Sequence, residues 1–487
     1  MVRRKGATVL RVFEAHVQEL KNDVLRSVAK LAWADDLQTG ILDIPEQLIP
    51  GPEAKMRCCI YKERAIISQR VKVAMGGDRT NPNLVEVLDI ACDECPVTEI
   101  SVGPSCRGCI ATRCVHACPK DAIAVVDRKA QIDHKKCITC GKCVAACPYG
   151  AIEKKTRPCE RSCKAGAISM GEDKKAFIDP NKCTSCGACV YQCPFGAIMD
   201  KSFIVDAIQM LQGAEKWGFR VYAAVAPSIA GQFAPADLGQ VVTGLKMLGF
   251  HDVVEVALGA DMTAKHEAVE LEEKGMLASS CCPAFVDFVE KNFPEQAHLI
   301  SSTPSPMIMA ARSIKKKDPS AKVIFIGPCV AKKKEVKLGK TMRAVDSALT
   351  FEELYAMFES RDIDVSKLDF TELDQASGFG RSFARSGGVT AAVKEALAER
   401  GSKFEVKPMP CSGLEACKLA FLKAAKGIGD FNFIEGMACE GGCVQGPAQL
   451  IRSPKNQGDV DRHAKQAEGR TIEEAVTAAE QRQDEEA

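Results

Sequence analysis

The sequence lacks a charge bias, a long apolar run and a secretion signal. Its 487 residues contain 65 Lys and Arg against 64 Asp and Glu, so the formal net charge is only +1. A balanced charge gives no general attraction to nucleic acid or to an anionic membrane surface. No apolar run is long enough to span a bilayer, and no apolar segment follows the basic start Met1–Thr8. We therefore expect a soluble cytoplasmic protein that binds neither membrane nor nucleic acid.

Two common redox-cofactor patterns are missing as well. No Gly-x-Gly-x-x-Gly follows an expected strand, so the chain shows no fingerprint of a flavin or nicotinamide site. Residues 1–90 hold no cysteine spacing of the plant-type 2Fe–2S kind. Any electron-transfer chemistry must therefore come from other cysteine patterns further along the chain.

Residues 1–90 are expected to be a helical and mixed region with little chemistry. Helical periodicity runs over Val9–Leu37, Ile44–Pro52 is expected to be a loop, and partial alternation over Lys55–Met75 predicts strands. Cys58-Cys59 is an adjacent pair with no third ligand nearby, so we expect both thiols to pack in the core rather than to bind a metal.

Cysteine is abundant elsewhere, with 25 residues in all. A secreted disulfide scaffold suits much shorter chains, and here the number is odd and the dominant spacing is Cys-x-x-Cys. Metal ligation is therefore favoured, which implies a reducing and anaerobic setting.

Four cysteine-rich repeats make up residues 91–200. Two bacterial ferredoxin runs, Cys-x2-Cys-x2-Cys-x3-Cys-Pro, begin at Cys137 and Cys183, and a looser copy begins at Cys106. Each run is followed by a tail that ends in Ala-Ile. The fourth repeat keeps only its tail, Ala165–Ile168, and two cysteines before it.

In two-cluster ferredoxins the last cysteine of each run ligates the cluster of the other run. This rule predicts about four 4Fe–4S clusters. The expected ligand sets are Cys106, Cys109, Cys114 and Cys147; Cys137, Cys140, Cys143 and Cys118; Cys183, Cys186, Cys189 and Cys163; and Cys159 and Cys193 with Cys92 and Cys95. The last pair is assigned because its cluster otherwise lacks two ligands; alternatively, Cys92 and Cys95 are structural or bind a separate metal. A chain of clusters conducts electrons between a redox site and a soluble carrier.

The pattern changes after the ferredoxin-like region. Buried strands are expected at Arg220–Ala226, Val253–Leu258 and Lys322–Ile326, with helices at Gly239–Leu248 and Thr263–Lys274. Alternating strands and helices indicate an α/β domain, over residues 203–455, with a largely parallel sheet. Such sheets place ligands at the carboxyl ends of their strands. The polar segment 456–487 contains an expected helix, Thr471–Gln481, and is expected to be a solvated tail.

Three cysteine-bearing stretches in the α/β domain should meet at those strand ends: Ser279-Ser-Cys-Cys-Pro-Ala-Phe285, Ile326-Gly-Pro-Cys-Val-Ala-Lys-Lys-Lys-Glu335 and Phe433-Ile-Glu-Gly-Met-Ala-Cys-Glu-Gly-Gly-Cys-Val-Gln-Gly-Pro447. In this order they closely resemble the three motifs of the [FeFe]-hydrogenases, and with the ferredoxin-like region the resemblance covers roughly residues 92–455. It implies an α/β fold (α+β overall), with ferredoxin-like 4Fe–4S domains before a two-lobed H-cluster domain. It also implies a cofactor, a cubane bridged to a di-iron unit with CO, cyanide and a bridging dithiolate, and maturation proteins that insert that unit.

The resemblance implies roles for individual residues. The ligands of the cubane correspond to Cys282, Cys329, Cys439 and Cys443, of which Cys443 also bridges to the di-iron unit. The proton relay corresponds to Cys281, then Glu270 and Ser301 behind it, then Glu267 further out. The contacts of the di-iron unit correspond to Lys332, Pro227, Ser228 and Met437.

Simpler interpretations exist for some of these residues. Without the resemblance, Glu267 and Glu270 would be a solvated helix face and Met437 would be core filler. The next two lysines in the second motif are expected at the surface, and Cys411 and Cys417 are expected to pack in the core. The sequence departs from the family pattern at five positions: Gly327, Ala284, Phe285, Glu440 and Met307. These departures indicate a divergent monomeric group.

The implied function is interconversion of H2 with protons and electrons, with ferredoxin as the electron carrier. One alternative is a non-catalytic, hydrogenase-like iron–sulfur assembly or scaffold protein, which would need no proton relay. The other is an H2 sensor, which in this family usually carries an added signalling domain. Cys281 with Glu270 argues against the first alternative, and the short segment after residue 455 argues against the second.

Overall fold

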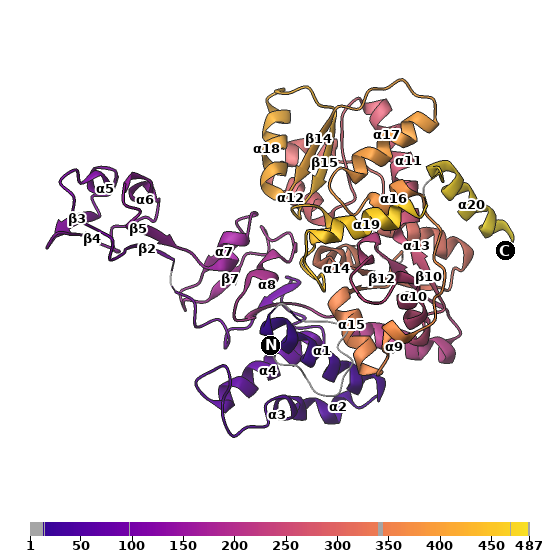
Figure 1. Ribbon diagram of the computed structural model, residues 1–487, viewed down its shortest axis with the longest axis horizontal. Coiled ribbons are helices and arrows are strands. Elements are labelled where there is room, and N and C mark those ends of the chain that lie inside the picture. Colours follow the sequence, from indigo (N-terminus) through magenta and orange to yellow (C-terminus); the bar gives the residue numbers. More distant parts are fainter. Residues whose placement is uncertain (1–12, 14, 97, 339–343, 468, 486–487) are drawn as a thin grey trace.

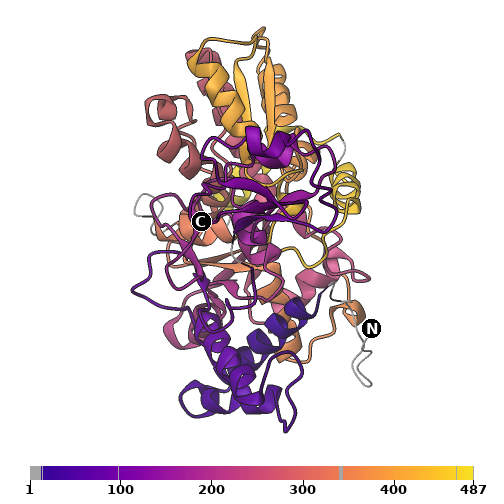
Figure 2. The same ribbon diagram turned by 90° about the vertical axis from the view of Figure 1, so that its left-hand side faces the viewer.

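A computed structural model describes residue 13 and residues 15–96, 98–338, 344–467 and 469–485. A small cysteine-rich module lies at one end of the molecule, a second module lies beside it, and a larger α/β domain lies at the other end (Figure 1). In the view from the end that carries the small module, this module lies in front of the large domain (Figure 2). None of the described helices is long and apolar enough to cross a membrane.

The described N-terminal residues are mainly helical: α1 (His16–Trp33), α2 (Leu37–Gly40), α3 (Ile44–Leu48) and α4 (Ile60–Ala74). The helical prediction for Val9–Leu37 is confirmed where the structure describes it. The loop predicted at Ile44–Pro52 begins only after α3, and the prediction of strands in Lys55–Met75 is wrong. In α4, residues Ile66, Ile67, Arg70, Val71 and Ala74 are buried. Their spacing follows the 3.6-residue period of one helix face, which the partial alternation concealed. Cys58 and Cys59 are exposed just before α4, so the prediction that they pack in the core is also wrong.

The first cysteine-rich module consists of two antiparallel strand pairs and two short helices. β2 (Glu99–Val102) pairs with β5 (Ile152–Lys155), and β3 (Ile123–Val126) pairs with β4 (Lys129–Ile132). The helices α5 (Arg113–His116) and α6 (Lys142–Ala146) carry cysteines between the strands.

The second module repeats this plan with a discontinuous chain. β6 (Ile168–Met170) pairs with β7 (Ala176–Ile178), and β8 (Ile198–Asp200) pairs with β1 (Val85–Val87), which precedes the whole first module. The main-chain bond from Leu88 N to Ala197 O, at 2.7 Å, matches the bond from Gly103 N to Ala151 O in the first module, also at 2.7 Å. The first module is therefore inserted into the second, whose front part is the segment around β1.

The large domain contains two parallel sheets, which confirms the predicted α/β class. One sheet has the order β10–β9–β12–β13 (Asp252–Glu255, Val221–Val225, Lys322–Gly327 and Ser347–Thr350). The other has the order β11–β15–β14 (Leu277–Ala278, Phe433–Met437 and Pro408–Ser412). The predicted helices are present as α10 (Leu238–Met247) and α11 (Val256–Lys274). The strand predicted at Val253–Leu258 ends at Glu255, because α11 begins directly after it.

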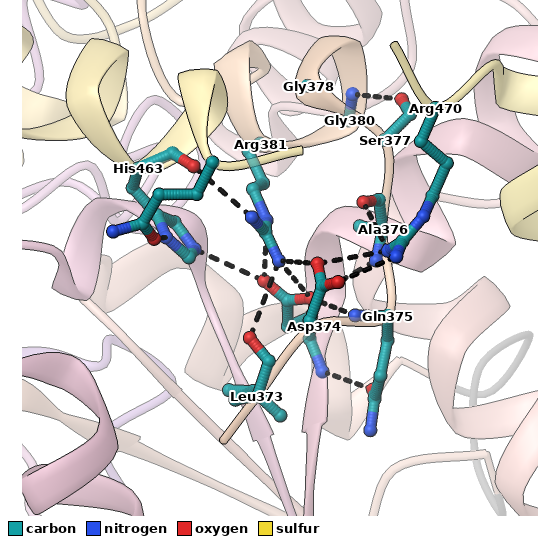
Figure 3. Close-up of polar contacts among 12 residues, drawn as sticks. Leu373, Asp374, Gln375, Ala376, Ser377, Gly378, Gly380, Arg381, His463 and Arg470 are labelled. Atoms are coloured by element: carbon teal, nitrogen blue, oxygen red, sulfur yellow. Dashed lines mark hydrogen bonds and ion pairs between the residues drawn. The ribbon is translucent and has the colours of Figure 1, made fainter. Parts of the chain in front are cut away.

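The C-terminal residues form α19 (Lys455–Lys465) and α20 (Ile472–Glu485). The predicted helix is confirmed, but the prediction of a solvated tail is wrong, because α19 packs on α16 (Gly378–Ser382) and α20 packs on α11. A polar network holds the C-terminal helices against the large domain. Arg381 binds Glu255 and Asp374, and Arg470 also binds Asp374 (Figure 3). His463 of α19 contacts the same Glu255 carboxylate at 3.1 Å.

Candidate metal centre

The three cysteine motifs meet where strands of the two sheets end. Cys281 and Cys282 follow β11 and lead into α12 (Pro283–Asn292). Cys329 follows β12 and precedes α14 (Val330–Lys337), while Cys439 follows β15. Parallel strands direct their carboxyl ends to one side, so these loops surround a common volume.

That volume is a cavity between the three motifs. Its walls contain the residues assigned to the cubane, to the contacts of the di-iron unit and to the first proton-transfer step: Cys282, Cys329, Cys439, Cys443, Lys332, Pro227, Ser228, Met437 and Cys281. Met307, one of the departures from the family pattern, also lines the cavity and is fully buried. At this position the cavity wall is therefore apolar.

Glycine allows the third motif to approach its neighbours. Gly442 has a φ of 92°, and a Cβ there would lie 2.8 Å from the carbonyl oxygen of Ala384. A Cβ at Gly446 would lie 2.7 Å from the carbonyl oxygen of Pro328. Side chains at these positions would push Cys443 away from the second motif.

Three of the four candidate cubane ligands, Cys329, Cys439 and Cys443, are poor thiolate formers on their own. Burial, followed by the charges of neighbouring cysteines, raises the pKa of both Cys329 and Cys443 to about 12. A cationic iron–sulfur core would supply the positive charge that these thiols need to ionise. No group of three or more His, Cys, Asp or Glu among the described residues is arranged to hold a single metal ion. Four thiols spread around one cavity fit a cubane instead.

Polar groups beside the cavity fit an anionic ligand. The Ser228 hydroxyl is buried and has no hydrogen-bond partner within the described part of the chain. The Lys332 ammonium donates to Glu335 Oε2 at 2.7 Å, to Ser305 Oγ at 3.0 Å and, more weakly, to Cys281 O at 3.3 Å. An unpartnered hydroxyl and a buried cation are what a cyanide ligand would require.

The carboxylate nearest Cys281 is Glu267, so the expected order of the relay is wrong. Burial, and next the charge of Glu267, hold the pKa of Cys281 well above its ordinary value. Glu267 is fully buried and accepts bonds from Ser280 N at 2.9 Å and from Ser280 Oγ at 3.2 Å. Its other carboxylate oxygen is buried and unpartnered in the described structure. Burial raises the pKa of Glu267 to about 7, which suits a group that exchanges protons near neutral pH.

Glu270 lies on the solvent side of Glu267. It accepts bonds from Ser301 Oγ at 2.5 Å and from Lys274 Nζ at 2.6 Å, and the Lys274 side chain is 45% exposed. Burial alone would raise the pKa of Glu270, but the bonds from Lys274, Ser301 and Ser302 outweigh it and lower this pKa to about 2. The sequence placed both carboxylates on one helix, but it could not show which end of α11 faces the cavity.

The sixteen cysteines assigned to the four 4Fe–4S clusters are called the wire cysteines here. The first two of their four sets each surround a small cavity in the first module. Cys106, Cys109, Cys114 and Cys147 line one of them. Cys118, Cys137, Cys140 and Cys143 line the other. Each group is one of the sets expected from the exchange of last cysteines.

The other two sets lie in the second module. Burial, followed by Cys186, Cys183 and Cys163, raises the pKa of Cys189 well above its ordinary value, so these four thiols are neighbours. Burial, followed by Cys193 and Cys92, raises the pKa of Cys95. Burial, followed by Cys193 and, more weakly, Cys92, also raises the pKa of Cys159 to about 12. The structure therefore brings Cys92 and Cys95 to Cys159 and Cys193.

The second module touches the cavity between the three motifs. Cys186 is part of the cavity wall. A Cβ at the next residue, Gly187, would lie 2.8 Å from Pro447 and 2.9 Å from Val330, which belong to the third and second motifs. The set that contains Cys186 is therefore the one next to the candidate cubane.

Sequence reasoning missed a buried ionic cluster behind the second motif. Lys333 is fully buried and binds Asp200 at 2.8 Å and Glu353 at 3.0 Å, so the prediction of a surface position for it is wrong. Lys21 of α1 binds the other oxygen of Asp200 at 2.6 Å. Lys334 is partly exposed and pairs with Asp287. The partners of Lys333, Asp200 and Glu353, are distant from it or unremarkable in sequence, so the local sequence could not show that this lysine is buried.

Cys411 and Cys417 are both buried, which confirms the prediction that they pack in the core. Cys417 Sγ lies 3.8 Å from the carbonyl oxygen of Cys411 and 3.7 Å from that of Met437. These cysteines line none of the cavities described above.

Comparisons with known proteins identify family domains in this chain. Residues 219–447 match the family described as "Iron only hydrogenase large subunit, C-terminal domain". Residues 105–151 match a 4Fe–4S dicluster domain, and residues 176–199 match a 4Fe–4S binding domain. A solved [FeFe]-hydrogenase structure is 21% identical with a TM-score of 0.49, covering 57% of this chain and 93% of that one.

Two curated relatives extend over most of the chain. The periplasmic [Fe] hydrogenase large subunit of Nitratidesulfovibrio vulgaris is 31% identical over 382 residues, which are 66% of this chain and 86% of that protein. Iron hydrogenase 1 of Clostridium pasteurianum is 31% identical over 402 residues, which are 70% of this chain and 69% of that protein. This chain therefore belongs to the iron-only, or [FeFe], hydrogenase family, with iron–sulfur domains before an H-cluster domain.

Proposed function

We propose that this protein interconverts H2 with protons and electrons and exchanges the electrons with ferredoxin. The observation that carries the proposal is the arrangement of Cys281: it lines the cavity with four candidate ligands and has the titratable Glu267 behind it. An assembly scaffold would need the ligands but not a buried thiol with a carboxylate of pKa about 7. The cytoplasm is the proposed compartment, because so many thiolate ligands need a reducing environment.

The proposed cofactor of the cavity is the H-cluster. Cys282, Cys329, Cys439 and Cys443 would hold the cubane, and Cys443 would also bridge to the di-iron unit with its CO, cyanide and dithiolate ligands. Lys332 and Ser228 would donate hydrogen bonds to cyanide, and Met437 would pack against the unit. When bound, the di-iron unit supplies the binding and cleavage of H2. Its insertion would depend on dedicated maturation proteins.

The chain's own contribution is to move protons. Cys281 would gain or release a proton at Sγ, and Glu267 would exchange it with the thiol. Glu267 and Glu270 are three residues apart on α11 and therefore share a face of that helix. Glu270, bound to Ser301 and to the half-exposed Lys274, would complete the path to solvent.

The first module is the proposed docking site for the carrier. Between residues 99 and 155 the sequence has ten Lys and Arg against five Asp and Glu, which leaves 55 basic and 59 acidic residues elsewhere. All ten of these basic side chains are exposed, and Ile110, Ile138 and Tyr149 are exposed beside cluster cysteines. A basic surface with apolar contacts suits an acidic carrier such as ferredoxin. Lys135→Glu with Lys136→Glu should raise KM for ferredoxin and leave turnover with a dye unchanged, whereas Lys403→Glu on the large domain should change neither.

Substitutions at two adjacent cysteines test the enzymatic proposal. Cys281→Ala should keep the infrared bands of metal-bound CO and cyanide and lose nearly all H2 turnover, because alanine cannot transfer a proton. Cys281→Asp should recover part of the turnover, since a carboxyl group also titrates. Cys282→Ala should fail at assembly instead. Near-normal turnover in Cys281→Ala would remove this thiol from the mechanism, and an inactive parent protein without CO bands would favour the scaffold.

A further inference from the structure

The four sets of wire cysteines share one pattern of backbone hydrogen bonds. In each set the cysteine that precedes an Ala-Ile tail accepts a bond from the tail alanine, at 3.2–3.4 Å: Ala122 to Cys118, Ala151 to Cys147, Ala167 to Cys163 and Ala197 to Cys193. Each set also accepts a second backbone bond, at 3.4 Å: Ala130 to Cys106, Thr139 to Cys137, Ser185 to Cys183 and Ala176 to Cys92. With respect to these bonds the four sets are equivalent.

The set of Cys92, Cys95, Cys159 and Cys193 differs through a buried arginine. Arg157 is 1% exposed, and its Nη1 lies 3.9 Å from Cys92 Sγ. Its other donors bind the carbonyl oxygens of Pro96 and Lys174. Among the described residues it is the one charged side chain with a hydrogen bond to a wire cysteine, and no Asp or Glu pairs with it.

A second buried arginine lies on the other side of the same set. Arg70 of α4 is 2% exposed and donates to Phe195 O at 3.1 Å and to Met199 Sδ at 3.8 Å, but its Nε has no partner. Phe195, whose carbonyl oxygen Arg70 binds, is two residues after the cysteine Cys193. The described structure contains no carboxylate paired with Arg70. Two buried, permanently charged side chains thus lack a protein anion and face the same four thiols.

We propose that Arg157 and Arg70 raise the reduction potential of the cluster held by Cys92, Cys95, Cys159 and Cys193 above the potentials of the other three wire clusters. The proposal rests on the proposed function, which assigns a cluster to these four cysteines. The reaction concerned is a one-electron reduction by the neighbouring cluster, in which no bond forms or breaks. Net charge and hydrogen bonds to sulfur set such potentials, and a nearby cation stabilises the reduced, more negative form.

This cluster would hold the electron between the first module and the set next to the cavity. The module that contains Cys92 and Cys159 lies between the first module and the large domain (Figure 1). Within it, the charge of Cys159 acts on Cys189, a ligand of the set adjoining the cavity. An electron on this cluster would be one transfer away from the cluster whose ligands adjoin the cavity. It would also be shielded from the exposed surface of the first module.

Potentiometric titration followed by electron paramagnetic resonance tests the proposal on the full chain with its clusters. The parent should show one cluster that is reduced at a higher potential than the others. In Arg157→Gln this component should shift to lower potential, with at least a tenfold change in electron partition, which is about 59 mV for one electron. Arg157→Lys should stay close to the parent because the charge is kept. Arg161→Gln, at an exposed arginine on helix α7 (Pro158–Ser162), which begins directly after Arg157, is the matched control and should cause no such shift.

The variant Cys95→Ser tests the cluster assignment and the tuning of the reduction potential separately. Loss of one cluster together with the high-potential component supports both the cluster assignment and the tuning. Loss of one cluster with the high-potential component intact overturns the tuning alone, and unchanged iron content overturns the assigned cluster itself. If Arg157→Gln cannot hold its iron, Arg70→Gln decides, and an unshifted titration in that variant refutes the proposal.

Discussion

Replacing Glu267 by glutamine should stabilise the protein at high pH and abolish its turnover. Glu267 is fully buried, one carboxylate oxygen accepts two bonds from Ser280, and the other has no partner in the described structure. Glutamine has nearly the same shape and can accept the same bonds from Ser280. It cannot ionise, so it removes both the cost of a buried charge and the ability to transfer a proton.

The size of the effect follows from the pKa. Burial raises the pKa of Glu267 from 4.5 to about 7, a difference that corresponds to about 3 kcal/mol. Below pH 4.5 the carboxyl group is protonated in both the folded and the unfolded protein, so it costs nothing. Between pH 4.5 and 7 only the unfolded protein releases the proton, and stability falls as pH rises. Above pH 7 the whole cost of about 3 kcal/mol applies to the parent but not to Glu267→Gln.

Thermal unfolding under anaerobic conditions measures this difference. If the large domain unfolds as one unit of roughly 280 residues, 3 kcal/mol corresponds to about 5 °C in Tm. We expect Glu267→Gln to exceed the parent by about this much at pH 8 and to match it near pH 4.5, while H2 evolution with a dye is lost. Glu273→Gln, on the exposed side of α11, is the control and should change neither property. Equal Tm values at pH 8, or retained turnover, would refute the reasoning.

The remaining predictions concern other charged groups and the wire. Glu270 has a pKa lowered to about 2, so its stabilising effect is present above pH 4.5 and is lost as the pH falls toward 2; Glu270→Gln should therefore lower Tm at pH 7 but not at pH 2. Cys95→Ser should lose about one 4Fe–4S equivalent of iron and acid-labile sulfide in protein made without the di-iron maturases, and full iron content would contradict this. Lys332→Ala should impair retention of the di-iron unit, by an effect on the order of a few kcal/mol, while the wire clusters remain; full maturation with normal turnover would show the lysine to be dispensable. Lys333→Met should destabilise the protein by about 3–5 kcal/mol because it leaves the buried Glu353 carboxylate without a cation and Asp200 with Lys21 alone, whereas Lys334→Met should have little effect on Tm.

The cysteine patterns could be predicted because ligand spacing is local. Each run places three thiols within seven to nine residues, and the Ala-Ile tails supply N–H groups to the last cysteine of each run. The sequence also suggested Cys92 and Cys95 as the missing pair. It could not show that β1 is the missing strand of the second module, because β1 and β8 are more than 100 residues apart and each is only three residues long.

The predictions that were wrong share one physical cause, which is contacts between residues distant in sequence. Composition after residue 455 is polar, yet α19 packs on α16 and its His463 contacts the buried carboxylate of Glu255 at 3.1 Å. Lys333 looks like its exposed neighbour in sequence, but its helix turns it toward Asp200. The relay order depended on which end of α11 adjoins the cavity, and a helical repeat carries no information about that direction.

The ionic cluster around Asp200 links the parts of the molecule that must keep a fixed separation. Lys21 comes from the N-terminal helices, Asp200 from the strand that ends the second module, and Lys333 from the helix that follows the cubane ligand Cys329. Buried ion pairs add little net stability, because desolvation offsets their attraction, but each fits only one arrangement of its partners. Apolar contacts alone would tolerate small displacements between the second module and the large domain. We infer that this cluster fixes the position of the second module relative to the large domain. It thereby fixes the distance from the set containing Cys186 to the cavity that this set adjoins.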